Sequence, residues 1–404
     1  MSTMLDKSHL DEDIHPESRL DSWRKQLSRT DLGPTPILIG LAVIWIVFQL
    51  LNPHFLSARN LTNLILQAAA TGTISIGIVL ILLLGEIDLS VGAVSGLCGS
   101  IVAVFNVNHG IPGPISCLIG ILAGLAIGLF QGLWITRFKI PSFVVTLAGL
   151  LAWQGAQLLV LGETGTINLR DPFMVGIANT FFPAYVGWIV ALVFVIVFVY
   201  SMIGERSRRM AVGLSVGSAG GLIFRGVIIT IATFGATALM NSYRGLPLAL
   251  VIFVGLIIVF DLITRKTTFG RHIYAVGGDA EASRRASINV DAIRVAVMAL
   301  GSTMAALGGI MAESYLLAVN QSSGSGDVLL NAIASAVIGG TSLFGGRGSV
   351  WSALIGALVI FSIANGMDLL ALPSSIKFMI TGGVLLVAVT IDAVTRRRRE
   401  VTGR

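Results

Sequence analysis

Runs of about twenty predominantly apolar residues recur along the whole chain, and this recurrence constrains its fold more than any other feature. A helix of that length crosses the ~30 Å hydrocarbon core of a bilayer, whereas a helix buried in a soluble protein is seldom apolar on every face. Only 12% of the 404 residues are charged, about half the share typical of soluble domains. We therefore predict an all-α polytopic membrane protein. The runs are residues 34–51, 61–84, 89–107, 115–135, 143–161, 181–203, 222–239, 248–263, 295–318, 328–344, 350–370 and 376–394.

We predict ten to twelve transmembrane helices. Run 328–344 is short and run 89–107 begins at a polar break, so both are candidates for broken or re-entrant helices. If every run crosses, all but four of the 27 Lys and Arg residues fall on one side of the membrane. The positive-inside rule makes that side cytoplasmic, and both termini lie on it. The expected parts are a cytoplasmic tail (1–33, with an interfacial helix near 20–27), a transmembrane domain (34–394) and a basic cytoplasmic tail (395–404). The four outside residues are Arg59, Arg170, Arg244 and Lys377.

Charge and motif content exclude several function classes. The net charge of +6 comes from basic residues in tails and short loops, so it indicates topology and not a nucleic-acid partner. Cys98 and Cys117 lie in apolar context without metal-ligand spacing, so we expect neither a disulfide framework nor a metal site. The sequence contains no phosphate-binding G-x-x-x-x-G-K-[ST] loop and no catalytic constellation. We expect no enzyme activity and no cofactor in this chain.

Residues 264–294 form a charged island between two apolar runs. Its excess of basic residues places it on the cytoplasmic side, where it offers a docking surface to a soluble partner. Two glycines interrupt the backbone, an aspartate follows that can cap a helix, and a glutamate suits the first turn. We predict a short helix over about 279–287 that contacts the partner; a plain solvated basic loop is the alternative. The candidate coupling residues are Gly277, Gly278, Asp279, Glu281, Ala282, Arg284 and Ser287.

A second group of candidates surrounds the polar break before run 89–107. Carboxylates near membrane depth are costly unless they meet water, a cation or a donor. Glu86 and Asp88 therefore either lie at the interface and cap the next helix, or line a pathway and act in gating or solute contact. Both interpretations stay open. The candidates for a pathway or gate are Glu86, Asp88, Ser90, Gln67 and Asn331.

Small residues suggest two further features. Residues 84–96 (LGEIDLSVGAVSG) and 343–356 (LFGGRGSVWSALIG) share a polar glycine-containing break, Ser-Val and a small-residue helix. The similarity is either the remnant of an internal repeat or a coincidence. Gly120, Gly124 and Gly128 follow one another at four-residue spacing and predict close helix packing.

Four separated motifs occur in one order: EIDLSVG (86–92), PSF with VTLAG (141–149), the series FGR, YA, GG, EA and INV (269–290), and VIGGTSL (337–343). They are accompanied by YRG (243–245) and AVGL (211–214). Together these motifs resemble the permease subunits of bacterial ABC sugar importers. Within this family the chain is most similar to the xylose branch of the ribose/xylose subfamily, and the likeness extends over about residues 57–392. Two positions of the island depart from the family pattern, with Asp279 where Asn is usual and Ser287 where Gly is usual.

This resemblance implies a homodimeric channel in the bacterial inner membrane, in contact with lipid. Two copies of a cytoplasmic ATPase, which hold ATP and Mg, would gate the channel, and a periplasmic sugar-binding protein would supply it. The implied solute is a monosaccharide, and the similarity to the xylose branch implies D-xylose or a related pentose. A proton-coupled secondary sugar transporter acting through Glu86 or Asp88 without an ATPase is one alternative, and a membrane scaffold or receptor subunit without solute flux is another.

Overall fold

The computed structural model describes residues 35–162, 165–213 and 219–401, so the predicted tail at 1–33 and its helix near 20–27 lie outside the described residues. Within the described part, nine helices are long and apolar enough to cross a membrane, and three shorter apolar helices accompany them. The all-α polytopic class is confirmed. The apolar helices are α2 (Thr35–Leu51), α3 (Ala58–Leu83), α4 (Val91–Ala103) continued by the π-helix η1 (Val104–Asn108), α5 (Gly113–Phe138), α6 (Ser142–Leu161), α8 (Ala184–Ala211), α9 (Ala219–Asn241), α10 (Leu248–Lys266), α13 (Val290–Leu316), α14 (Asp327–Ile338), α15 (Trp351–Leu369) and α16 (Ser374–Val401).

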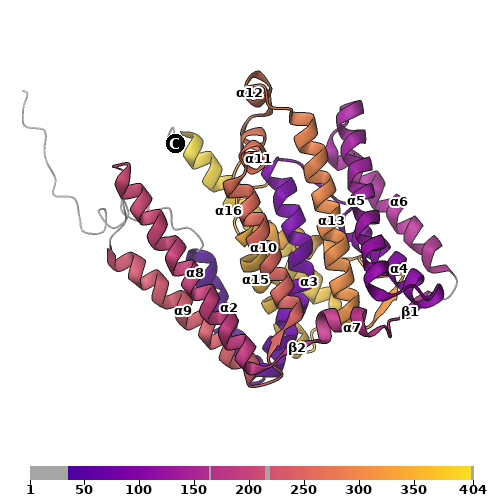
Figure 1. Ribbon diagram of the computed structural model, residues 1–404, viewed down its shortest axis with the longest axis horizontal. Helices are drawn as coiled ribbons and strands as arrows, with labels where there is room; N and C mark the ends of the chain where they lie inside the picture. Colours follow the sequence, from indigo (N-terminus) through magenta and orange to yellow (C-terminus); the bar gives the residue numbers. More distant parts are fainter. Residues whose placement is uncertain (1–34, 163–164, 214–218, 402–404) are drawn as a thin grey trace, which may run out of the picture.

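Helices α3 and α13 form the centre of the bundle, and small residues allow their close approach (Figure 1). A Cβ on Gly77 of α3 would lie 2.7 Å from the Gly301 carbonyl oxygen of α13. On its other side α13 receives α5, where a Cβ on Gly124 would lie 2.8 Å from the Ser302 carbonyl oxygen. Gly128 packs against the same helix and Gly120 against α4, so the packing predicted for this glycine row is confirmed.

Run 328–344 is interrupted, and run 89–107 becomes helical only after its polar break, as the sequence predicts. Helix α14 has 12 residues and is therefore about 18 Å long, too short for the hydrocarbon core. Helix α4 has 13 residues before η1 and starts only after the break at 84–90. The break at 339–350, between α14 and α15, resembles the break at 84–90 in placement. Each break follows a helix that runs toward the same end of the bundle.

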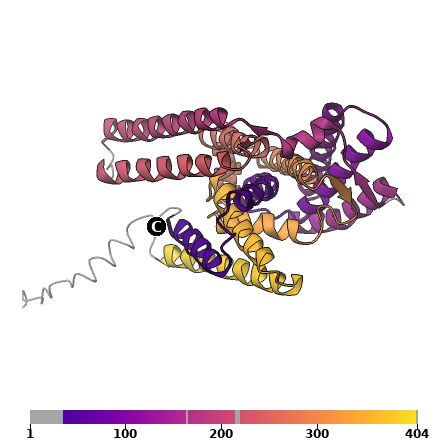
Figure 2. The same cartoon turned by 90° about the horizontal axis from the view of Figure 1, so that it is seen from below.

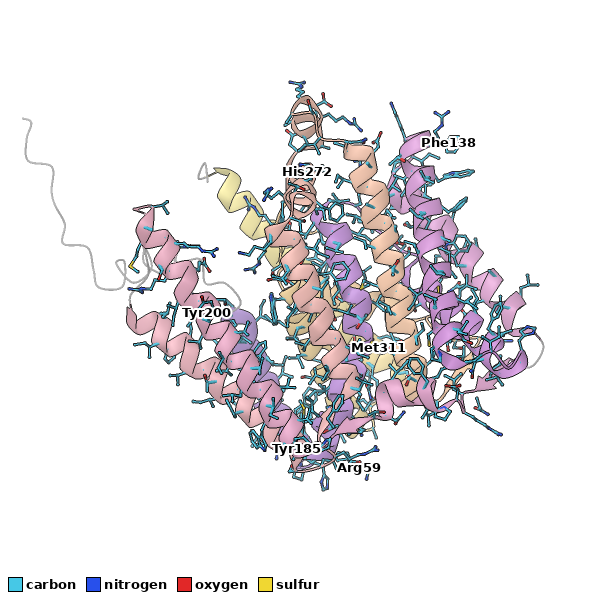
Figure 3. The ribbon with its side chains drawn as sticks, viewed as in Figure 1. Arg59, Phe138, Tyr185, Tyr200, His272 and Met311 are labelled. Carbon is cyan, nitrogen blue, oxygen red and sulfur yellow. The ribbon has the colours of Figure 1, made fainter. Side chains whose placement is uncertain are left out.

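The two ends of the bundle carry different elements. His272 of α11 (Thr268–Gly278) and Phe138 mark one end, with α12 (Ala280–Arg285) beside them, and Arg59 and Tyr185 mark the other (Figure 3). The positive-inside rule assigns the α11–α12 end to the cytoplasm. Helices α8 and α9 form a hairpin that leans away from the body (Figures 1 and 2).

The external end holds short elements that the sequence analysis did not predict. Strand β1 (Thr166–Asn168) pairs antiparallel with β4 (Ala318–Asn320), and β2 (Phe181–Phe182) with β3 (Leu246–Pro247). Helix α7 (Pro172–Asn179) lies between β1 and β2 in the chain. The apolar runs at 143–161 and 181–203 leave the residues between them unassigned, because strands of two or three residues carry almost no periodic signal.

Candidate functional site

The charged island folds into two short helices, α11 and α12, whose N-termini are capped by side chains. The Thr267 hydroxyl accepts a hydrogen bond from the Gly270 N–H (3.1 Å) and starts α11. The Asp279 carboxylate accepts from the N–H groups of Glu281 and Ala282, both at 2.9 Å, and starts α12. The predicted cap is therefore confirmed. The helix after it is shorter than predicted, since it ends at Arg285 and not at 287, and the sequence analysis missed α11.

Helix α12 turns a charged surface to the solvent. Glu281, Ala282 and Arg284 are exposed, whereas Ser283 is buried against the neighbouring helices. The Arg284 guanidinium lies 3.4 Å from the Asp291 carboxylate. Because both side chains are exposed, solvent and salt weaken this ion pair. This surface has the exposure and charge that docking to a soluble partner requires, and it is the part of the island that lies farthest from the bundle (Figure 1).

The two departures from the family pattern have local explanations. Ser287 has φ +63°, the left-handed conformation that glycine adopts without a Cβ penalty. A residue with a Cβ costs roughly 1–2 kcal/mol in this conformation, so the glycine usual in the family suits this turn better. Asp279 caps α12 as an asparagine also would, because both side chains are preferred N-caps. The second departure therefore keeps the geometry and adds a negative charge.

The end of α11 touches both helix breaks through close backbone contacts, and the Tyr274 hydroxyl also donates to the Gly348 carbonyl (3.0 Å). A Cβ on Gly277 would overlap the Leu83 carbonyl oxygen at the end of α3 and lie 2.8 Å from the Gly346 N–H. The Gly346 N–H donates to that same carbonyl (2.9 Å). A Cβ on Gly345 would lie 2.9 Å from the backbone nitrogen of Gly85. We call these four residues, Gly85, Gly277, Gly345 and Gly346, the glycine junction. It joins the coupling helices, the 84–90 break and the 339–350 break.

Glu86 pairs with an arginine of α13 next to this junction. Its carboxylate lies 2.8 Å from the Arg294 guanidinium, and the side chains are only 15% and 27% exposed. Arg294 is the last residue of the charged island and belongs to the first turns of α13. The ion pair therefore connects the 84–90 break to the far side of the coupling region. A cap on the next helix, one of the two interpretations left open, is not the contact that Glu86 makes.

Asp88 is buried and shapes the start of α4. One carboxylate oxygen accepts from the N–H and the hydroxyl of Ser90, both at 2.7 Å, and Gln131 of α5 donates to that hydroxyl (2.9 Å). The second oxygen has no hydrogen-bond partner in the described part of the chain. Asp88 also lines a cavity of about 20 Å³ between α3 and α14, large enough for one water molecule. Burial raises the pKa of Asp88, and the hydrogen bonds from Ser90 offset this only in part.

Hydroxyl groups of α6 satisfy the backbone of the same break. The Ser142 hydroxyl accepts from the Ile87 N–H (3.2 Å), and the Thr146 hydroxyl accepts from the Leu89 N–H (3.1 Å). Both hydroxyls belong to the 141–149 motif, which the sequence analysis recognised without assigning it a contact. A further residue of that motif, Gly149, leaves room for Gln131, because a Cβ there would lie 2.5 Å from the amide nitrogen of Gln131.

The remaining two candidates lie apart from this cluster. Gln67, in the external half of α3, donates to the Tyr315 hydroxyl of α13 (3.1 Å). Asn331, near the start of α14, donates to the Asp327 carboxylate (3.4 Å). The Gln67 contact joins α3 to α13, whereas the Asn331 contact lies within α14. Neither side chain has a recorded hydrogen bond to the 84–90 break among the described residues.

Sequence analysis missed one buried acid. Glu313 of α13 is 2% exposed, and neither carboxylate oxygen has a hydrogen-bond partner among the described residues. Its carboxyl group occupies the space beside Gly99 of α4, where a Cβ would overlap it. An acid within the apolar run 295–318 was the signal that could have found it, because such residues are costly in a membrane.

We predict that the glycine junction tolerates no methyl group at Gly277. Gly277→Ala should lower the melting temperature of the purified protein, because relieving the overlap with the Leu83 carbonyl requires a backbone shift that costs about 1–3 kcal/mol. Gly278→Ala is the matched control, since a Cβ there meets nothing within 4 Å. The two variants are compared by thermal unfolding in detergent, and equal melting temperatures would contradict the junction.

Comparison with known proteins adds the family. A family model described as "Branched-chain amino acid transport system / permease component" matches residues 60–389. The xylose transport system permease protein of Escherichia coli K12 is 38% identical over 344 residues, 85% of this chain and 87% of that protein. Its Haemophilus influenzae counterpart is 37% identical over 374 residues, 92% of this chain and 99% of that protein.

A more distant relative belongs to ribose import. The ribose import permease protein of Bacillus subtilis is 29% identical over 361 residues, 89% of this chain and 92% of that protein. No solved structure matches this chain. The family match covers most of the transmembrane bundle together with the coupling helices and both breaks. This chain is therefore a multi-pass membrane permease that belongs to the family of branched-chain amino acid transport system permease components.

Proposed function

We propose that the chain is the membrane-spanning subunit of an ATP-driven, binding-protein-dependent importer of a monosaccharide, with D-xylose or a related pentose as solute. Two copies would form the pathway across the bacterial inner membrane, and ATP and Mg would be held by a separate cytoplasmic ATPase. The names of the relatives support the solute class, because they describe xylose and ribose permeases.

One observation carries this proposal. Four motifs far apart in the sequence, at 86–92, 141–149, 269–290 and 337–343, converge on the cytoplasmic end of the bundle around the glycine junction. The exposed helix α12 follows α11, and the backbone of α11 contacts both helix breaks. A partner that displaces α12 would therefore act directly on the transmembrane helices. A protein that moved solute without a soluble partner would have no use for such a connection.

The proposed mechanism uses this convergence. When the ATPases close on ATP, they would displace α12, and α11 would carry the displacement to the junction. Because the backbones of Gly277, Leu83 and Gly346 are in direct contact, both breaks would move with α11. The Glu86–Arg294 ion pair would hold the break to α13 during the movement. We assign Glu86 to gating, and Asp88 and Ser90 to the shape of the break.

ATP-driven uptake tests the proposed function. The permease is reconstituted in liposomes with the ATPase and the binding protein of the same transport system, and offered labelled pentoses and hexoses. We expect uptake of a pentose that requires ATP and the binding protein. Uptake by the permease alone, driven by a proton gradient, would establish the secondary transporter acting through Glu86 or Asp88 instead.

The Glu86–Arg294 pair is predicted to contribute to coupling. Glu86→Gln and Arg294→Gln should each reduce ATP-driven uptake. The double variant should lose little more than either single variant, because both substitutions remove the same ion pair. Asp88→Asn is the control, since the amide oxygen can accept the same two hydrogen bonds from Ser90. Uptake is measured at matched expression. Additive losses from the two single substitutions would show that the pair does not act as a unit.

A further inference from the structure

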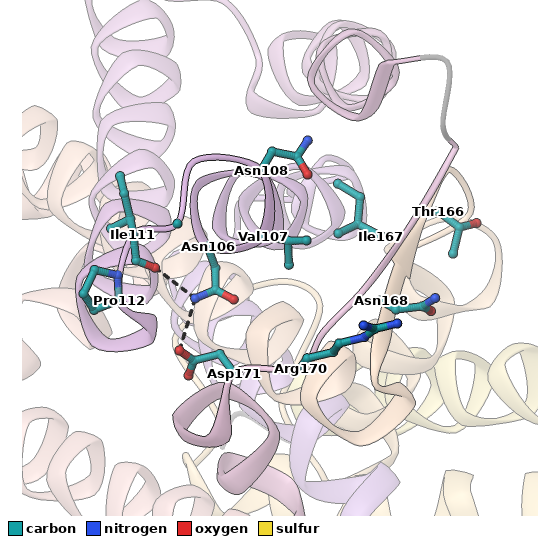
Figure 4. Close-up of a pocket in the computed structure, with 11 residues that line it drawn as sticks. Asn106, Val107, Asn108, Ile111, Pro112, Thr166, Ile167, Asn168, Arg170 and Asp171 are labelled. Carbon is teal, nitrogen blue, oxygen red and sulfur yellow. Dashed lines mark hydrogen bonds between the residues drawn. The ribbon is translucent and has the colours of Figure 1, made fainter.

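A polar groove lies at the external end of the bundle, opposite the coupling helices (Figure 4). It has a volume of about 620 Å³. One wall is the π-helix η1 with the turn after it, and the other is β1 with the residues that follow. The lining includes Asn106, Asn108, Thr166, Asn168, Arg170 and Asp171.

Strand alternation turns one wall of the groove outward. Thr166, Asn168 and Arg170 are exposed, whereas Ile167 and Leu169 between them are 5% exposed and join an apolar cluster below. Three polar side chains therefore point away from the core in a row along the groove. The row is held in place because β1 is paired with β4.

The negative charge in the groove is already engaged. Asp171 accepts hydrogen bonds from the N–H groups of Phe173 (2.9 Å), Met174 (3.1 Å) and Gly113 (3.3 Å), and from the Asn106 amide (3.3 Å). Partial burial raises the pKa of Asp171, but these hydrogen bonds outweigh it and the pKa is lowered. The carboxylate thus ties the two walls together. No ion pair engages Arg170 within the described part of the chain, so its guanidinium faces the solvent with its donors available.

We propose that this groove receives a carboxylate-bearing loop of the extracytoplasmic solute-binding protein, with Arg170 as the anchor; the inference rests on the proposed function. A guanidinium takes a carboxylate in a bidentate pair, and the flanking amides donate to and accept from a peptide backbone. A monosaccharide is less suited to the site, because small-molecule sites enclose most of their ligand and this groove is open along its exposed row.

The groove is also connected to the cytoplasmic end through one element. Its η1 wall continues α4, and the start of α4 is the Asp88–Ser90 turn of the 84–90 break. A loop that settles against η1 therefore contacts the far end of a helix whose near end lies beside the glycine junction. Single π-helical turns that interrupt α-helices are also frequent at functional sites. Docking outside would thus be transmitted to the ATPase side along α4.

The test uses the permease–ATPase complex in nanodiscs and the xylose-loaded binding protein of the same transport system. Arg170→Glu should weaken docking by about tenfold or more, because a charge reversal repels the partner carboxylate, and should reduce the ATPase stimulation that docking causes. Arg59→Glu makes the same charge change at another exposed external arginine and should leave both quantities within about twofold of wild type. Thermal unfolding verifies that both variants are folded.

Three outcomes overturn the groove assignment while wild-type uptake stands. Docking of Arg170→Glu could equal that of wild type; both variants could weaken docking equally, which would indicate the charge of the whole face; or Arg170→Glu could change only the binding of free xylose, which would make the groove a sugar site. Absence of ATP-driven uptake by the wild-type complex would instead overturn the proposed function.

Discussion

The structure depends on satisfying the interrupted backbone where α3 and α14 end. Amide and carbonyl groups there have no helical partner, and buried backbone groups need one from elsewhere in the chain. The protein supplies them from its own chain: Ser142 and Thr146 accept from the break at 84–90, and Gly346 donates to the Leu83 carbonyl. Both breaks are therefore possible only because α6 and the coupling helices pack against them. This requirement ties the membrane crossings to the cytoplasmic surface.

Small residues determine how closely these parts approach. Where a Cβ would meet backbone, as at Gly77 and Gly277, the helices touch through main-chain atoms. Such contacts leave no flexible side chain between the elements to absorb a displacement. Displacement of one partner is then transmitted to the other, because packed interfaces shift between discrete arrangements rather than deform continuously. Helix α4 extends this connection, since it is enclosed by α5, α6 and α13 and reaches from the break to the external groove.

The sequence predicted the features that depend on local pattern. The apolar runs correspond to the crossings, and a capping aspartate after two glycines correctly predicted the start of α12. The features it did not predict depend on partners distant in the chain. Strand β1 exists because β4 lies beside it, about 150 residues later. The meeting of Gly85 with Gly345 could not be deduced either, although the shared shape of 84–96 and 343–356 was noticed. Glu313 was overlooked because the residues around it in run 295–318 are mostly apolar.

The central claim is that the coupling helices and the 84–90 break move as one body. It is tested by spin-label distances in the permease–ATPase complex, with Cys98→Ala and Cys117→Ala as background and labelled chains diluted with unlabelled ones. Labels at the exposed positions of Arg271→Cys and Ile87→Cys report on this body, and Tyr200→Cys on the α8–α9 hairpin reports from outside it. With a non-hydrolysable ATP analogue, the 271–87 distance should stay constant while the 271–200 and 87–200 distances change together. A change in the 271–87 distance would contradict the account.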